Sequence, residues 1–152
     1  MRLVIQRVSQ ASVEIDGKIN GEIQEGFMVL VGINNEDNEI IIDRMIDKLI
    51  HLRIFEDENE KLNLSLLDVK GSILSISQFT LYANCKKGRR PSFLDAAKPD
   101  VSKPLYEKFN EKLREKGIKV ETGVFGAMMQ VKLVNSGPTT IILDSEEIVK
   151  RE

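Results

Sequence analysis

Apolar and polar positions in the first third of the chain follow patterns that are typical of strands. The segments 2–8 (RLVIQRV) and 11–15 (ASVEI) are rich in β-branched residues, which strands favour. Asp16–Gly17 stands between ASVEI and KINGEI, and this dipeptide is a strong signal for a hairpin turn. The segment 26–33 (GFMVLVGI) is almost entirely apolar, which indicates a strand that is buried on both faces.

The next segment changes to a helical period. Apolar side chains recur at the spacing of one helix face at Ile41, Met45, Leu49 and Leu52. Acidic residues are enriched just before them, where they favour the start of a helix. We therefore expect a helix from about Glu36 to Leu52.

A second helix is predicted over residues 102–117, SKPLYEKFNEKLREKG. Ser102 can cap its start, Pro104 suits a first turn, and Gly117 is a typical end. Its buried stripe is expected to consist of Leu105, Phe109 and Leu113.

Four further segments have the composition of strands: 71–83, 118–126, 127–135 and 139–143. No internal repeat, low-complexity segment or linker divides the chain. Together the elements predict an α+β fold that is mainly β, in which two helices pack on a sheet or partial barrel. At 152 residues, positions 1–152 are expected to form a single domain.

The composition is that of an ordinary globular protein, with a formal net charge of −2. This balance argues against a protein that coats nucleic acid through bulk charge, although a local basic patch is compatible with it. Cys85 is the single cysteine, which excludes an intrachain disulfide and favours a reducing compartment. No segment is long and apolar enough to span a bilayer, and Arg7 falls where a signal peptide needs its apolar core. We expect a cytoplasmic protein with no membrane partner.

The common arrangements of catalytic side chains are absent from the sequence. His51 is the one histidine and lies within the first predicted helix, where a surface or core role is the usual one. No second histidine or cysteine completes a zinc site, and no carboxylates have metal-ligand spacing. No base stands near Cys85 in sequence, and the glycine-rich phosphate-binding motifs and G-x-S-x-G are missing. The sequence therefore indicates no metal and no cofactor.

Three polar features remain in unusual places. Ser77–Thr80 (SQFT) ends an apolar strand, Asn135–Pro138 (NSGP) lies between two β-branched segments, and a loop without periodicity carries four basic residues. These basic residues are Lys86, Lys87, Arg89 and Arg90. Each feature has a plain structural interpretation, which is a half-exposed strand, a tight turn and a solvated loop respectively. Judged singly, the plain interpretation is favoured in each case.

The combination of SQFTLYA, a following GRRPSF loop and NSGPTT near the C-terminus resembles the D-aminoacyl-tRNA deacylases. The opening MRLVIQRVSQASV is similar to the N-terminal strand of that family, and the resemblance runs over essentially the whole chain. It implies hydrolysis of the ester that joins a D-amino acid to the 3′-terminal adenosine of tRNA, without a cofactor. It also implies a homodimer in which the Gly-Pro step of each subunit enters the active site of the other, with a cis bond between Gly137 and Pro138.

On this resemblance the Gly-Pro step acts as a clamp for the aminoacyl group. Gly137 has no Cβ, so a ligand can approach its backbone, and Pro138 has no N–H, so the backbone presents acceptors. Such a clamp can hold the ammonium group and α-hydrogen, whereas an L side chain would clash with the backbone. Discrimination by exclusion predicts that glycyl-tRNA is hydrolysed too, because glycine has no side chain to exclude. Ser77 is expected to support this substrate-binding region.

Catalysis is expected from the remaining residues of SQFT. Gln78 is the favoured polar contact, because its amide both donates and accepts hydrogen bonds. Backbone N–H groups near Phe79 and Thr80 can stabilise the oxyanion. The Thr80 hydroxyl is expected to position a group or bind water rather than act as the nucleophile, since no base is in sequence reach. Water or the 2′-OH of the substrate takes part in proton transfer.

Other segments are expected to contact the acceptor end of tRNA. Phe125, in TGVFGAMM, is placed under the terminal adenine, with core packing as an equally open alternative, and Met129 lines the same pocket. The expected phosphate contacts are Lys86, Lys87, Arg89 and Arg90. Arg7 is expected to pair with the Gly-Pro loop and hold its orientation.

Two other functions stay open on the residues alone. One is a small-molecule esterase or amidase that uses the same site without RNA, which the basic loop disfavours and which salt-sensitive tRNA binding would exclude. The other is a dimeric RNA-binding or scaffolding domain in which the SQFT and Gly-Pro elements only build an interface.

Overall fold

The computed structural model describes residues 1–149 of the chain. Its strands are β1 (Arg2–Ile15), β2 (Lys18–Ile23), β3 (Gly26–Gly32), β4 (Phe55–Glu56), β5 (Leu62–Leu64), β6 (Ser72–Ser77), β7 (Val120–Thr122) and β8 (Gln130–Asp144). Its helices are α1 (Glu39–His51), α2 (Leu66–Val69), α3 (Pro99–Glu115) and α4 (Ser145–Ile148), with a 3-10 helix η1 (Phe79–Tyr82). The sequence predicts α1 and α3 but not α2 and α4, because four residues are too few to show a helical period. Among the described residues, no helix has both the length and the apolar character needed to cross a membrane.

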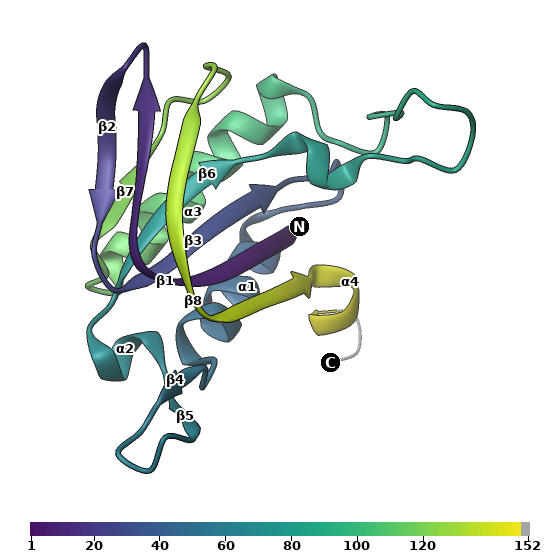
Figure 1. Cartoon of the computed structure of the whole chain (residues 1–152). Coiled ribbons are helices and arrows are strands. Elements are labelled where there is room, and N and C mark those ends of the chain that lie inside the picture. Colours follow the sequence, from purple (N-terminus) through teal and green to yellow (C-terminus); the bar gives the residue numbers. More distant parts are fainter. Residues whose placement is uncertain (150–152) are drawn as a thin grey trace.

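Six strands form one sheet that curls almost into a barrel (Figure 1). The strand order is β2-β1-β3-β6-β7, and β8 pairs with β1 outside this path. β1 is antiparallel to β2, β3 and β8, whereas β6 is parallel to both β3 and β7. The two ends of the order meet where Nδ2 of Asn20 on β2 donates to the carbonyl oxygen of Thr122 on β7 at 2.7 Å. The predicted mainly β fold, with a partial barrel and packed helices, is therefore confirmed.

Apolar side chains cover both faces of the sheet. Successive residues of a strand point to opposite faces, so Phe27 of β3 packs towards the helices while Met28 points into the barrel. The helix-side core includes Ile42, Met45, Leu49, Phe109 and Leu113, with Leu105 partly buried beside them. The barrel core consists of Val8, Ala11, Val13, Ile23, Met28, Leu74 and Ile76. The apolar run in β3 is needed because each of its faces meets one of these cores.

α3 begins earlier than the sequence pattern predicts. Its N-cap is Lys98 and Pro99 occupies its first turn, so the prediction that Ser102 caps the helix is wrong. Ser102 lies inside the helix and is buried. Pro99 and Asp100 already supply the proline and the acidic residue that favour a helix start, and the helix therefore begins at that earlier signal.

The strand predicted over residues 71–83 ends at Ser77. The backbone N–H of Gln78 donates to the carbonyl oxygen of Val31 at 2.8 Å, and the chain then turns into η1. The residues after Ser77 therefore do not alternate across a half-exposed strand. SQFT is located at the point where a buried strand becomes a 3-10 turn.

β8 runs through the Gly137–Pro138 step without a turn. It pairs with β1 on both sides of the step, and a shift in register leaves residues 136–139 opposite Arg7 alone. Gly137 has φ of +119°, and its bond to Pro138 is cis. The step is part of a four-residue bulge within one strand, so its interpretation as a tight turn is wrong.

Candidate active site

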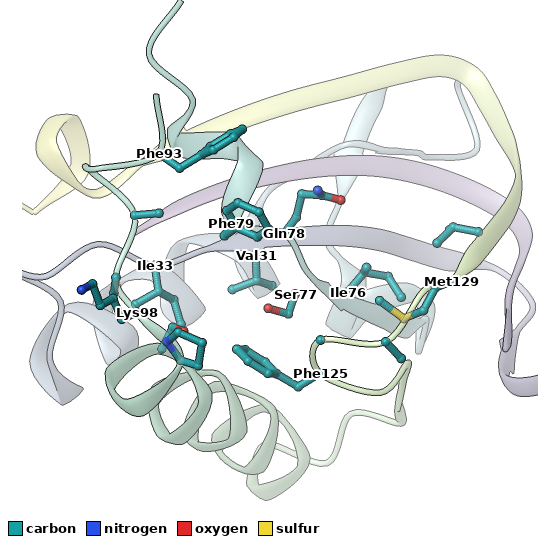
Figure 2. A pocket seen from close by; sticks show the side chains of 17 residues that line it. Val31, Ile33, Ile76, Ser77, Gln78, Phe79, Phe93, Lys98, Phe125 and Met129 are labelled. Carbon is teal, nitrogen blue, oxygen red and sulfur yellow. The ribbon is translucent and has the colours of Figure 1, made fainter. Parts of the chain in front are cut away.

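A cavity of about 540 Å³ opens beside the end of β6 (Figure 2). β3 and the start of η1 contribute to its wall, together with segments 93–102 and 125–131. Val31 and Ile76 are among its apolar lining residues, and Ser77 and Gln78 supply polar groups. A mostly apolar space with a few polar groups is typical of a ligand site. Tertiary structure assembles this one from four separate parts of the chain.

Gln78 occupies the turn between β6 and η1. Its backbone bond to β3 holds this turn against the sheet. Its side-chain amide donates to Oγ1 of Thr80. Thr80 is exposed and does not line the cavity, so its hydroxyl contacts the amide of Gln78 and not the cavity itself.

Two backbone N–H groups are free at the start of η1. Within this turn, the N–H of Leu81 donates to the carbonyl oxygen of Gln78 and that of Ala83 to the carbonyl oxygen of Thr80, at 3.3 and 3.0 Å. The N–H groups of Phe79 and Thr80 have no acceptor within residues 1–149. The first residues of a helical turn lack an intrahelical acceptor, so these donors are available to a ligand oxygen.

Phe125 faces the cavity from the side of α3 (Figure 2). Its ring centroid lies 6.1 Å from that of Tyr106, and the side chain also packs against the helix-side core. Both expected environments of Phe125, the pocket and the core, are therefore present. Met129 lines the same cavity, and Gly123 leaves room for it, because a Cβ atom there would lie 2.2 Å from Sδ of Met129.

A buried hydrogen bond anchors the strand that leads to the site. The hydroxyl of Tyr106 on α3 donates to the carbonyl oxygen of Ser75 on β6 at 2.7 Å. Burial raises the pKa of the Tyr106 phenol above its usual value, so the neutral, donating form is favoured. This bond joins α3 to β6 two residues before Ser77.

Besides apolar wall residues such as Val31 and Ile76, the sequence-based prediction misses Phe93, Lys98 and Ser102 at the cavity. The ring of Phe93 makes an edge contact with Phe79, with centroids 5.0 Å apart and planes at 74°. The motif GRRPSF contains this phenylalanine, and a large apolar residue in a basic loop is a signal that points to it. No comparable signal marks Lys98 or Ser102, whose place at the cavity depends on where α3 begins.

Other predicted residues lie away from the cavity of their own chain. Gly137 and Pro138 are exposed in the β8 bulge and do not line it. The basic residues lie in a loop, 85–91, that is closed by two backbone bonds of 2.8 and 2.9 Å between Asn84 and Ser92. All four basic side chains of this loop are exposed, and none has an ion-pair partner within the described chain. They are Lys86, Lys87, Arg89 and Arg90.

Arg7 is buried beside the Gly-Pro bulge. Its Nε donates to the carbonyl oxygen of Ser136 at 3.2 Å, and its Nη1 donates to that of Ile54 at 2.9 Å. Nη2 lies 3.7 Å from a carboxylate oxygen of Glu56. The guanidinium thus joins the bulge to the segment at the start of β4.

The site contains no histidine and no metal-binding cluster. His51 is exposed on α1, where its Nδ1 lies 2.8 Å from the carbonyl oxygen of Asp47. Within residues 1–149, no group of three or more His, Cys, Asp or Glu side chains is placed to hold a metal ion. Cys85 is exposed in the basic loop.

Comparison with known proteins finds similar sequences over nearly the whole chain. The sequence matches the family model of D-Tyr-tRNA(Tyr) deacylase over residues 4–144. A D-aminoacyl-tRNA deacylase of Bacillus pumilus (strain SAFR-032) is 65% identical over 147 residues, which cover 97% of this chain and 100% of the relative. A D-aminoacyl-tRNA deacylase of Thermus aquaticus is 58% identical over 147 residues, covering 97% of each chain.

Two solved structures share the fold. The c-Myc DNA unwinding element binding protein superposes with a TM-score of 0.89 at 39% identity, covering 95% of this chain and 98% of the other. A probable eukaryotic D-amino acid tRNA deacylase superposes with a TM-score of 0.80, covering 93% and 97%, and at 20% identity this likeness concerns the fold alone. The chain belongs to the D-Tyr-tRNA(Tyr) deacylase family.

Proposed function

We propose that this chain hydrolyses the ester bond of D-aminoacyl-tRNA and of glycyl-tRNA, releasing the amino acid and free tRNA. The observation that carries the proposal is the cavity of about 540 Å³ at the end of β6, where an apolar space meets the amide of Gln78. The family of the chain supports the same reaction. The reaction belongs to the cytoplasm, where charged tRNA is used.

The terminal adenosine occupies the apolar part of the cavity. Phe125 offers its ring to the adenine, and Met129 packs beside it. Stacking of a base on an aromatic side chain contributes about 1–3 kcal/mol and tolerates different bases. Since every tRNA acceptor end presents the same terminal nucleoside, such a pocket accepts many tRNAs.

Ester cleavage requires attack of water on the carbonyl carbon and stabilisation of the oxygen that becomes negative. The free N–H groups of Phe79 and Thr80 are the donors for this oxygen. The amide of Gln78, held by the Thr80 hydroxyl, orients the ester or the attacking water. The bond from the carbonyl carbon to O3′ breaks, and the proton of the water passes to O3′, with the adjacent 2′-OH as the relay.

Selection against L-aminoacyl groups is assigned to the Gly137–Pro138 step of a second copy of the chain. The step lies outside the cavity of its own chain and is exposed, so it is free to approach the cavity of another copy. Its carbonyl oxygens accept hydrogen bonds from the ammonium group of the substrate. A side chain in the L configuration would meet this backbone, whereas a D side chain points away and glycine has none.

The outer face and edge of β8 are available for such a dimer. Ile142 and Val134 are 66% and 48% exposed. Within the described residues β8 pairs only with β1, so its other edge is open. Open edges and exposed apolar side chains are features that a second copy covers in a homodimer.

Mixed dimers test whether the site is shared. Gln78→Ala and Gly137→Ala are each expected to lose about 99% of the activity as homodimers, because every site then has one impaired component. Random co-assembly of the two variants makes about half of the dimers mixed, and each mixed dimer has one complete site of its two. The mixture is therefore expected to recover about a quarter of the wild-type activity. Activity that stays absent in mass-verified mixed dimers would exclude the cross-subunit assignment.

The activity itself is tested with matched D-, L- and glycyl-tRNA in the presence of EDTA. We expect release of the D-aminoacyl and glycyl groups while the L-aminoacyl ester is spared. Equal cleavage of D and L esters would contradict the exclusion mechanism. A small D-amino acid ester, assayed in parallel, tests the alternative of an esterase that does not use RNA.

A nucleic-acid-binding protein without catalysis is the second candidate. One observation favours it, because the structure that superposes with a TM-score of 0.89 is described as a DNA unwinding element binding protein. The free cations of the loop 85–91 also suit phosphate binding, which falls steeply with salt. A Gln78→Ala variant that folds, dimerises and binds tRNA normally but has lost turnover would exclude this candidate.

A further inference from the structure

An exposed aromatic pair stands at the mouth of the cavity. Phe79 and Phe93 are 55% and 38% exposed, and their rings meet edge to face. Figure 2 shows Phe93 at the outer side of the cavity, on the chain segment that leads down to Lys98. Leu94, the next residue, is 88% exposed. Apolar rings left open to solvent beside a polar loop indicate a surface that contacts a ligand.

Basic side chains lie on one side of this aromatic pair, and mostly acidic side chains lie on the other. Phe93 directly follows the closure of the basic loop 85–91, whose four cations have no ion-pair partner within residues 1–149. Beyond Leu94 lies a separate groove whose lining has four carboxylates and one cation, Arg2, which is paired with Asp144 at 3.0 Å. The carboxylates are those of Glu36, Asp95, Asp144 and Glu146. A polyanion that leaves the cavity is therefore attracted along the loop, where the charge is all positive, and not towards the groove, where carboxylates outnumber cations.

We propose that Phe93 is a stacking platform for the base of the nucleotide that precedes the terminal adenosine. The inference rests on the proposed function and extends it. If the cavity holds the terminal nucleoside, the rest of the RNA strand must leave through the mouth of the cavity. The phosphodiester between the two nucleosides passes Lys98, the one charged residue among those that line the cavity in the described structure. The following phosphates continue along the loop 85–91.

Stacking suits this position for a physical reason. The acceptor end is single-stranded, so its bases present open faces, and an aromatic ring holds such a base without reading its identity. The edge contact with Phe79 favours one orientation of the Phe93 ring. A preorganised ring loses little conformational entropy when a base packs on it.

The test is a thermodynamic cycle between the side chain and the base. D-aminoacyl-adenosine, the D-aminoacyl ester of cytidylyl-adenosine, and the same dinucleotide without the cytosine base are the three substrates. For the wild type, the base is expected to raise kcat/KM by about 5- to 150-fold. In Phe93→Ala this gain should fall to near one, so that loss of the ring and loss of the base are not additive.

Matched variants separate stacking from support of the fold. Phe93→Tyr keeps an aromatic face and should keep most of the gain, as should Leu94→Ala, which removes the exposed neighbour. If Phe93→Ala lowers kcat/KM equally on substrates with and without the base, or changes the oligomeric state, the platform is excluded.

A binding version of the cycle keeps the two proposals distinguishable. Affinity for uncharged cytidylyl-adenosine and its abasic form is measured without turnover, with wild type and Phe93→Ala. A protein that shows the coupled loss in binding but cleaves no ester supports the platform and overturns the proposed function. A protein that cleaves D-aminoacyl esters but shows no coupling overturns the platform alone.

Discussion

Arg7 packs against Gly137 so closely that a Cβ atom on the glycine would lie 2.9 Å from Nη2 of the arginine. The same guanidinium donates to the carbonyl oxygens of Ser136 and Ile54. A bulge of four residues in β8 is thereby held by one side chain of the paired strand β1. The shape of the Gly-Pro step depends on this buried cation.

Arg7→Lys tests this dependence. A lysine has the charge but not the planar fork that reaches two carbonyl groups at once, so at least one buried acceptor loses its donor. We expect the free energy of unfolding to fall by about 2–3 kcal/mol, measured by urea denaturation. Glu56→Gln is the control, because Glu56 is 52% exposed at 3.7 Å from Arg7 and its loss should cost less than about 1 kcal/mol.

Gly137→Ala should impair both stability and turnover. The φ of +119° disfavours any L residue, and the added methyl group would also lie 2.6 Å from Oγ1 of Thr139. We expect a loss of more than about 1 kcal/mol in stability, and about 100-fold in kcat/KM for D-aminoacyl-tRNA, as the clamp shifts. Gly117→Ala isolates the conformational effect, since Gly117 has φ of +85° and nothing within 4 Å of its added Cβ. Full activity in Gly137→Ala would contradict the clamp.

Thr80→Val distinguishes positioning from nucleophilic attack. Its hydroxyl accepts from the amide of Gln78, and one lost hydrogen bond of this kind corresponds to a decrease of about 5- to 10-fold in kcat. Loss of a true nucleophile would lower kcat by about 10⁴-fold or more. Thr80→Ser keeps the hydroxyl and should remain near wild type. Single-turnover kinetics with D-aminoacyl-tRNA measure the difference.

Neither tyrosine is expected to ionise at its usual pH. Burial raises the pKa values of Tyr82 and Tyr106 above 10.0, and these are the two tyrosines of a chain that has no tryptophan. Since the folded pKa values are raised, the stability that the neutral phenols contribute is complete below pH 10 and is lost as the pH rises through the folded values. Phenolate absorbance is therefore expected to appear together with unfolding. Its appearance near pH 10 with native circular dichroism would contradict the burial.

Asp37→Asn should destabilise the protein strongly. The α-ammonium group of Met1 lies 2.5 Å from Oδ1 of Asp37, with both side chains at most 1% exposed. Removal of the carboxylate charge leaves the buried ammonium group without a charged partner, with the Ser145 hydroxyl as its remaining acceptor, and loss of one partner of a buried ion pair costs about 3–5 kcal/mol. Asp43→Asn is the matched control, because its 2.7 Å pair with Lys112 is at the surface and contributes less than about 1 kcal/mol. Thermal and urea unfolding of the two variants measure the contrast.

Local chemistry explains why much of the fold is predictable. Asp16 and Gly17 both adopt positive φ, 51° and 77°, as their hairpin requires, and this preference belongs to the dipeptide itself. The apolar run in β3 and the helical period in α1 likewise report burial directly. By contrast, the start of α3 depends on a choice between two nearby proline signals, at Pro99 and Pro104, which short-range preferences do not decide.

The residues of the candidate site likewise fall into two groups, those that the sequence marks and those that only packing brings to the site. SQFT and NSGP stand out in the sequence because polar groups, glycine and proline interrupt apolar strands. Phe93 is marked only by the basic loop before it, and Lys98 and Ser102 carry no signal, because their place at the cavity comes from where the segment 93–102 packs. The placement of Phe125 on a wall shared by cavity and core also depends on packing.

The sequence by itself determined where most strands of the large sheet lie, the two long helices and the two motifs, since each depends on the intrinsic preferences of neighbouring residues; the short strands β4 and β5 and the end of β6 at Ser77 were not among them. Only the tertiary structure decided that the Gly-Pro step is a bulge, because the same residues suit a turn and long-range pairing of β8 with β1 on both sides selects between them. It also decided that Arg7 holds the bulge and that four distant segments enclose one cavity. Contacts between residues far apart in the chain are set by the packing of the whole core, and no local pattern contains them.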